Sequence, residues 1–147
     1  MLGHYRILRR LGRGGMGVVY AAEDQKLGRT VALKVLLEAT QKDSGAVDRF
    51  WREARTASSL NHPGICTIHE LNENGDQPFI VMELLEGQSL DRLYVRQTMP
   101  YPRLLEFGVQ VADALDAAHR RGVLHRDIKP SNLFLSATGQ APGSELR

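Results

Sequence analysis

The sequence has little of what marks secreted, membrane-bound or nucleic-acid-binding proteins. Its single cysteine, Cys66, cannot form an internal disulfide, so a reducing compartment, the cytoplasm, is the expected location. No apolar run approaches the ~18 residues that a membrane-spanning helix needs, and the N-terminus lacks the apolar core of a signal peptide. The net charge of only +2 gives no electrostatic reason to expect a nucleic-acid partner. These absences predict a soluble chain with no membrane segment.

Two features that could be functional have a simpler structural explanation. Cys66 lies among apolar residues in PGICTIHEL, which favours a buried structural thiol over a nucleophile. A basic cluster near the N-terminus is explained more often by a solvated surface than by a binding site. The cluster comprises Arg6, Arg9, Arg10 and Arg13.

Hydrophobic periodicity predicts a small β-sheet that is interrupted by one helix. Strand-like runs rich in β-branched or aromatic residues cover 5–12, 18–24, 30–37, 66–71 and 78–85. After the third run, residues recur at three- and four-residue steps along one face and predict a helix over 46–60. This predicted inner face comprises Ala46, Phe50, Glu53, Ala57 and Leu60.

The region after Gly87 has a helical pattern of its own. Pro102 suits the first turn of a helix, and Gly122 can close that helix at its C-terminal end. The apolar stripe between them comprises Leu104, Phe107, Val111, Leu115 and Ala118. The change from strands to helices predicts an α+β fold with two lobes that join near residues 83–87.

A glycine-rich stretch, GRGGMGVV, joins the first two predicted strands. Gly12, Gly14 and Gly17 have the G-x-G-x-x-G spacing, which on its own is explained as well by a tight hairpin. A dinucleotide site requires a helix directly after the glycines, whereas VVYAAED predicts a strand. A Walker-type loop is excluded because no Lys-Ser or Lys-Thr pair follows a glycine. A hairpin remains whose backbone N–H groups can approach phosphate oxygens.

Lys34 stands inside an apolar strand, VALK, and Glu53 lies on the predicted inner face of the following helix. By alternation, Lys34 alone could point to solvent. A glutamate on an apolar face needs a partner, however, because an unpaired buried charge is costly. We therefore predict an ion pair between Lys34 and Glu53, with the ammonium group held under the glycine hairpin where it can bind phosphate oxygens.

Residues 125–132, HRDIKPSN, gather charged and amide side chains between two short apolar runs. Asp127 can accept a proton from a hydroxyl group or orient that group. Lys129 can stabilise negative charge on a transferred phosphoryl group, and Asn132 can offer an amide oxygen to a metal ion. A polar surface loop explains any one of these residues but explains poorly why all of them occur at this spacing.

Together these stretches resemble the protein kinase family, in particular the eukaryotic-like serine/threonine kinases of bacteria. GRGGMGVV resembles the glycine-rich loop, VALK the strand lysine motif, MELLEG the hinge beside the adenine, and HRDIKPSN the catalytic loop. The resemblance implies an N-lobe at 1–83, a hinge at 84–87, a partial C-lobe with the catalytic loop at 88–141, and a non-matching tail at 142–147. DIKP favours a protein substrate over the small molecules of aminoglycoside- or choline-type phosphotransferases, whose loops usually lack Lys-Pro after the aspartate.

The resemblance also implies a role for each matched residue. ATP and Mg²⁺ are the implied cofactors, and a serine or threonine hydroxyl of a protein is the implied acceptor. Asp127 is implied as the catalytic base, Lys129 as the second catalytic residue, and Asn132 as a ligand of Mg²⁺. Backbone groups of Glu83 and Leu85 are implied to hydrogen-bond the edge of the adenine. The full implied ATP site comprises Leu11, Gly12, Arg13, Gly14, Gly15, Met16, Gly17, Val18, Val19, Ala32, Lys34, Glu53, Met82, Glu83 and Leu85.

The resemblance breaks at the C-terminal end. The family places an Asp-Phe-Gly triplet thirteen residues after the loop asparagine, where this sequence has Glu145. The 147 residues therefore hold half of a catalytic centre, and we expect no kinase turnover from them alone. The alternative function is a non-catalytic nucleotide- or partner-binding module, a pseudokinase fragment. Such a module has no need of Lys34, Glu53, Asp127 and Asn132 together.

Overall fold

The computed structural model of the chain describes residues 1–15, 17–73, 77–94, 98–125 and 128–136. The chain divides into two compact units. The sheet unit comprises Met1–Ser59 and Thr67–Leu84, and the helical unit comprises Leu60–Cys66 and Leu85–Arg147. Leu60–Cys66 therefore belongs to the helical unit, although it is flanked in sequence by parts of the sheet unit.

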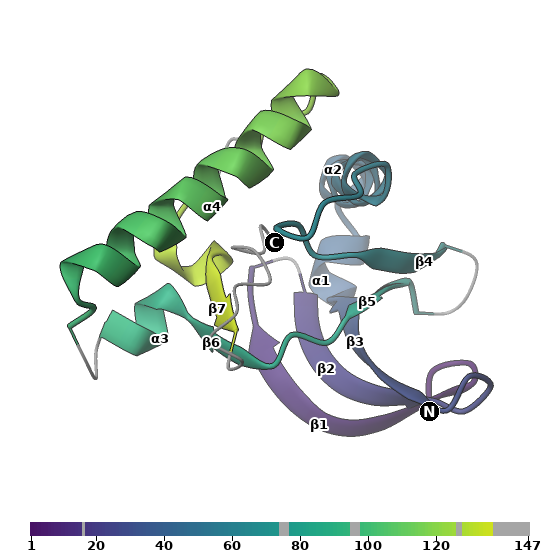
Figure 1. Cartoon of the computed structure of the whole chain (residues 1–147). Coiled ribbons are helices and arrows are strands. Elements are labelled where there is room, and N and C mark those ends of the chain that lie inside the picture. The colour runs from purple at the N-terminus through teal and green to yellow at the C-terminus, as the bar shows by residue number, and fades with distance from the viewer. Residues whose placement is uncertain (16, 74–76, 95–97, 126–127, 137–147) are drawn as a thin grey trace. The chain divides into compact units, whose positions relative to one another are not determined.

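The sheet unit is built on five antiparallel strands. Their arrangement can be followed in Figure 1. They are β1 (Tyr5–Arg13), β2 (Gly17–Asp24), β3 (Arg29–Leu36), β4 (Ile68–Asn72) and β5 (Phe79–Glu83). Their order across the sheet is β1-β2-β3-β5-β4, so β1 and β4 are the edge strands. The strands occur where the sequence pattern predicts them, with ends that differ by one or two residues.

One face of the sheet carries an apolar cluster with residues from β1, β2, β3 and β5. The cluster comprises Tyr5, Ala22, Val31, Leu33, Val35, Phe79 and Val81, all of them buried. Tyr5 of β1 packs edge-to-face on Phe79 of β5, with ring centroids 5.8 Å apart. Its hydroxyl group donates a 2.8 Å hydrogen bond to Glu70 of β4. Burial, with this bond to a carboxylate, raises the pKa of Tyr5 far above its ordinary value. The sheet is thus curled enough for a side chain of one edge strand to reach the other.

The turn between β2 and β3 is organised around a buried carboxylate, that of Asp24. One oxygen accepts hydrogen bonds from the backbone N–H groups of Lys26 and Leu27, at 3.0 and 3.1 Å. The side chains of His4 and Arg29 lie 3.4 and 3.7 Å from the carboxylate. Burial alone would raise the pKa of Asp24, but the two N–H donors and the neighbouring His4 and Arg29 bring that pKa below its ordinary value. The charged carboxylate therefore stabilises the folded turn.

Two helices follow β3, the short α1 (Glu38–Gln41) and α2 (Ser44–Ser58). The sequence predicts the second of them over 46–60. It begins earlier because Asp43 caps it, accepting a 3.2 Å hydrogen bond from the N–H of Ala46. Its buried residues are Ala46, Phe50, Trp51 and Ala54.

The helical unit contains α3 (Leu90–Tyr94), the long α4 (Tyr101–Arg120) and the single turn η1 (Pro130–Asn132). A two-stranded sheet pairs β6 (Gly87–Ser89) with β7 (Phe134–Ser136). Gly122 ends α4 as predicted, because its positive φ of 74° lets the chain turn back on the helix. Its N–H donates to the carbonyl of His119, and the N–H of Val123 donates to that of Ala118. In the described residues, no helix is long and apolar enough to cross a membrane.

The predicted apolar stripe of α4 is only partly covered. Phe107 and Ala118 are buried, whereas Leu104 is 36% exposed. Ala114 and Ala118 pack with Ile65 in an apolar cluster of the helical unit. Three other large apolar side chains on this helix are more exposed than Leu104. They are Tyr101 (81%), Leu105 (67%) and Val109 (70%).

Candidate nucleotide site

The glycine-rich stretch forms a hairpin between β1 and β2, as its sequence predicts. The N–H of Gly14 donates a 2.9 Å hydrogen bond to the carbonyl of Gly17, which closes the turn. Gly17 lies so near β3 that a Cβ atom would stand 2.6 Å from the carbonyl oxygen of Val35. A Cβ atom on Gly12 or Gly15 would meet nothing within 4 Å. Gly17 is therefore required by packing, while Gly12 and Gly15 leave open space at the hairpin. Met16 lies outside the described residues.

The register of the sheet brings the predicted adenine and phosphate contacts onto one face. Residues directly opposite each other in antiparallel strands, and residues two apart in one strand, share a face. One row across β2, β3 and β5 comprises Val19, Lys34 and Ile80, and the adjacent row comprises Ala21, Ala32 and Met82. Ala32 is fully buried and Met82 is 8% exposed, so small and apolar side chains surround the half-buried lysine. An apolar surface with one cation beside it is suited to an aromatic base that carries phosphates.

Lys34 lies on the same side of the sheet as α2. Its Nζ atom stands 5.7 Å from the centre of the Phe50 ring, within the range of a cation–π interaction. Lys34 also takes part in a further polar interaction. The alternative in which Lys34 points to open solvent is therefore wrong, because the side chain is half-buried.

The prediction that Glu53 lies on the inner face of this helix is wrong. Glu53 is exposed, and the salt bridges among the described residues do not include one between Lys34 and Glu53. The sequence pattern centres the face on Ala46 and Ala57, but the helix also buries Trp51 and Ala54, which moves the centre of the buried face away from Glu53. At ~100° per residue, Glu53 lies about 85° from the centre of the buried face, at its edge. A charged side chain in that position extends into water, where its solvation is retained.

The backbone of the hinge segment is partly engaged within the sheet unit. The N–H of Glu83 already donates a 2.9 Å hydrogen bond to the carbonyl of Thr67. The Glu83 carboxylate in turn accepts a long 3.5 Å hydrogen bond from the N–H of Thr67. The Glu83 N–H is thus occupied within the sheet unit. Leu85 belongs to the helical unit and is half-buried.

The structure describes part of the predicted catalytic loop. Arg126 and Asp127 lie outside the described residues. Lys129 is exposed and Asn132 is half-buried, and the N–H of Asn132 donates a 2.9 Å hydrogen bond to the carbonyl of Lys129. The following residue, Leu133, packs on the apolar cluster of the helical unit and accepts a hydrogen bond from the N–H of Leu90. Asn132 is thus held by backbone contacts on both sides.

No group of three or more histidine, cysteine, aspartate or glutamate side chains in the described segments could hold a metal ion. Asn132 is the described residue for which a metal contact is predicted, and one amide oxygen is less than Mg²⁺ ordinarily takes from a protein. Glu145, the residue at the spacing of the second ligand, is also outside the described residues.

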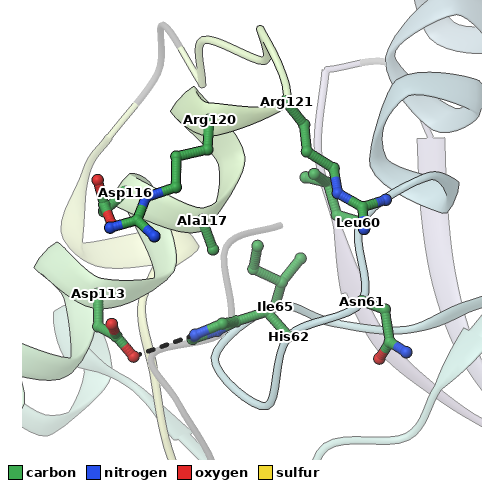
Figure 2. Close-up of a pocket in the computed structure, with 9 residues that line it drawn as sticks. All are labelled: Leu60, Asn61, His62, Ile65, Asp113, Asp116, Ala117, Arg120 and Arg121. Carbon is green, nitrogen blue, oxygen red and sulfur yellow. Dashed lines mark hydrogen bonds and ion pairs between the residues drawn. The ribbon is translucent and has the colours of Figure 1, made fainter.

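A pocket of about 360 Å³ lies within the helical unit, and none of the predicted site residues lines it (Figure 2). It is lined by Leu60, Asn61, His62, Ile65, Asp113, Asp116, Ala117, Arg120 and Arg121. One of these residues is His62, whose Nδ1 atom accepts a 2.9 Å hydrogen bond from the N–H of Gly64. The Nε2 atom is therefore the protonated nitrogen of the neutral ring, and it donates a 3.1 Å hydrogen bond to Asp113. Local sequence patterns do not predict this contact, because His62 and Asp113 are 51 residues apart.

Comparisons with known proteins show which family the chain matches and which proteins it is similar to. The family described as the protein kinase domain matches residues 5–144. The serine/threonine-protein kinase pkn2 of Myxococcus xanthus is 42% identical over 144 residues, which cover 98% of this chain and 17% of that protein. The serine/threonine-protein kinase PknA of Mycobacterium tuberculosis is 40% identical over 144 residues, which cover 94% of this chain and 33% of that protein. The chain thus spans less than two thirds of the length of these relatives.

Solved structures give the same fold. The kinase domain of PknI from Mycobacterium tuberculosis has a TM-score of 0.78 and 34% identity, over 93% of this chain and 57% of that domain. PpkA-294 in its apo form has a TM-score of 0.87 over 99% of this chain and 58% of that chain, and at 24% identity it supports the fold alone. The predicted α+β fold, an antiparallel sheet with one large helix followed by a partial helical lobe, is confirmed.

Proposed function

Because the chain belongs to the protein kinase family, we propose that it carries the nucleotide-binding part of a serine/threonine protein kinase. The substrate is a protein hydroxyl group, and the phosphoryl donor is ATP with Mg²⁺. The chain covers 17% to 33% of the length of the two kinases above. The activity of a whole kinase is therefore proposed for it.

One observation carries the nucleotide part of this proposal. Val19, Ala32 and Met82 form an apolar surface beside Lys34, on one face of the sheet and next to the glycine hairpin. The adenine packs on the apolar side chains, and the ammonium group of Lys34 binds phosphate oxygens. Open space in front of Gly12 and Gly15 lets backbone N–H groups come close to the phosphates.

The residues of the catalytic loop complete the chemistry. Transfer forms a bond between the acceptor oxygen and the γ-phosphorus, and it breaks the bond from that phosphorus to the oxygen that bridges it to the β-phosphate. Asp127 accepts the proton of the acceptor hydroxyl group, and Lys129 stabilises the charge on the transferred group. Mg²⁺, when bound, neutralises phosphate charge, and Asn132 is the residue that would hold it.

Lys34→Met tests the nucleotide site in the chain as it exists. Titration calorimetry with ATP should give measurable binding for the unmodified chain and none for this variant, because the phosphates lose their cation. Lys26→Met is the matched control, since Lys26 is an exposed lysine of the β2–β3 turn. Equal ATP affinity in the Lys34 and Lys26 variants would remove Lys34 from the site.

A non-catalytic module is the second candidate function. One observation favours it, the exposed position of Glu53. Protein kinases need the ion pair between the strand lysine and the helix glutamate. We therefore expect the chain by itself to bind ATP weakly and to transfer no phosphate. Transfer of radiolabelled phosphate to a generic protein substrate, absent in Asp127→Asn, would instead establish catalysis by these residues alone.

A further inference from the structure

The side chain of Lys34 is held at two points within the sheet unit. Its Cγ atom lies beside Gly17 at the start of β2, 3.7 Å from the position that a Cβ atom on this glycine would take. Its Nζ atom stands over the ring of Phe50 in α2, 5.7 Å from the ring centre. Lys34 takes part in one or more further interactions as well. The side chain therefore extends from the hairpin end of β2 towards α2.

The ring of Phe50 is suited to hold a cation because the ring itself is fixed. Phe50 and Trp51 are both buried, and their rings pack edge-to-face with centroids 5.0 Å apart. The face of an aromatic ring carries partial negative charge, which attracts an ammonium group. This attraction offsets part of the hydration that the half-buried Lys34 loses on folding.

Glu53, three residues after Phe50 in α2, does not hold Lys34 in this structure. Its side chain is exposed, and the salt bridges among the described residues do not include one to Lys34. The two kinds of partner also differ in chemistry. A carboxylate would neutralise the ammonium group and accept its hydrogen bonds, whereas an aromatic face leaves the charge and the N–H donors for phosphate oxygens.

We propose that Phe50 positions Lys34 for the phosphates of the nucleotide, the task that the resemblance gives to Glu53. Phe50 acts through Lys34, so it is a positioning residue, and this inference rests on the proposed nucleotide function. The competing explanation is that Phe50 only fills space between α2 and the sheet, as buried phenylalanines ordinarily do. The charge on the ring face separates the two explanations, because packing alone does not depend on it.

The test compares three replacements in the complete chain. Phe50→Leu removes the ring. Pentafluorophenylalanine at the same position keeps the shape of the ring and nearly its volume, but its fluorine atoms withdraw the negative charge from the ring face. Glu53→Gln is the matched control, since it removes an exposed charge from the same helix. ATP affinity is measured by titration calorimetry and the midpoint of urea unfolding on the same samples.

We expect both Phe50 variants to bind ATP about twofold to thirtyfold more weakly, the range of one cation–π interaction, and Glu53→Gln to bind it unchanged. Phe50→Leu should also unfold at lower urea because it leaves a cavity, while the fluorinated variant should keep its midpoint. Full ATP affinity in the fluorinated variant would overturn the proposal, because Phe50 would then act by packing alone. An equal or larger loss in Glu53→Gln would overturn it too, because the carboxylate would then hold Lys34.

The contact itself is followed without nucleotide, by NMR of a chain that carries isotopically labelled lysine. The lysines are Lys26, Lys34, Lys42 and Lys129, and Lys34→Met identifies the Lys34 signal by its loss. The ring current of Phe50 should shift the Cε protons of Lys34 upfield of the other three, and this shift should vanish in Phe50→Leu but persist in Glu53→Gln.

The NMR and calorimetry results separate this proposal from the proposed function. An unshifted Lys34 signal in the unmodified chain would refute the contact and the positioning role together, even if ATP binds. A shifted signal without any ATP binding would refute the proposed nucleotide function, and the contact between Phe50 and Lys34 would stand as a structural one.

Discussion

Replacing Gly17 by alanine should distort the glycine hairpin, because the added methyl group would overlap the backbone of β3. The added methyl group would stand 2.6 Å from the carbonyl oxygen of Val35, whereas ordinary van der Waals contact begins at 3.4 Å. The obstacle is backbone of the neighbouring strand, which cannot rotate away as a side chain can. Gly17 also begins the β2–β3 ladder, opposite Leu36. Relief of the overlap therefore requires the hairpin end of β2 to move away from β3.

Overpacking of this kind costs about 1–3 kcal/mol of unfolding free energy. With a urea dependence of about 2 kcal/mol per molar, the midpoint of unfolding should fall by roughly 0.5–1.5 M. The same movement displaces the hairpin over the proposed phosphate site, so ATP affinity should fall as well.

Gly15→Ala is the control for this prediction. It adds the same methyl group in the same hairpin, but the group meets nothing within 4 Å. Its midpoint should equal that of the unmodified chain or exceed it slightly, because alanine restricts the unfolded chain more than glycine does. Equal midpoints for the Gly17 and Gly15 variants in urea titrations followed by circular dichroism would refute the packing role of Gly17.

Three further predictions concern other parts of the chain. Asp24→Asn should lower the urea midpoint at pH 7, because the folded turn loses the charged carboxylate. The pKa of Asp24 in the folded chain lies below its ordinary 3.8, so the stabilisation by this carboxylate is fully present above pH 3.8. The difference in midpoint between the variant and the unmodified chain should vanish as pH falls through the folded pKa. Asp127→Asn, in a chain extended to a complete kinase domain, should lower kcat by roughly 10²–10⁴ and leave ATP affinity by calorimetry unchanged; a large loss of affinity with kcat preserved would contradict its role as base. Leu105→Ser/Val109→Ser should reduce self-association in sedimentation experiments, because both apolar side chains are exposed on α4; an Arg103→Ser control with the same effect would show that the apolar surface is not the cause.

Much of the fold follows from local patterns in the sequence. Alternation of apolar residues predicts the strands, and the strand after GRGGMG predicts a hairpin where a dinucleotide site would need a helix. Gly122 predicts the end of α4, since glycine adopts a positive φ without strain. Each of these features depends on residues that lie within a few positions of one another in the sequence. Their physical causes, side-chain alternation and backbone conformation, are equally local, so a short stretch of sequence is enough to predict them.

Local patterns in the chain are therefore enough to predict the elements, the hairpin and the family motifs, whereas packing between elements sets which faces and distant segments meet. The exposure of Glu53 depends on how α2 is rotated against the sheet, and the burial of Trp51 and Ala54 sets that rotation. The hydrogen bond from Tyr5 to Glu70 spans 65 residues and requires the curl of the whole sheet. The ion pair between Arg6 and Glu23 depends on a register that places these two residues opposite each other. Such contacts arise from packing between elements, which periodicity within one element does not encode.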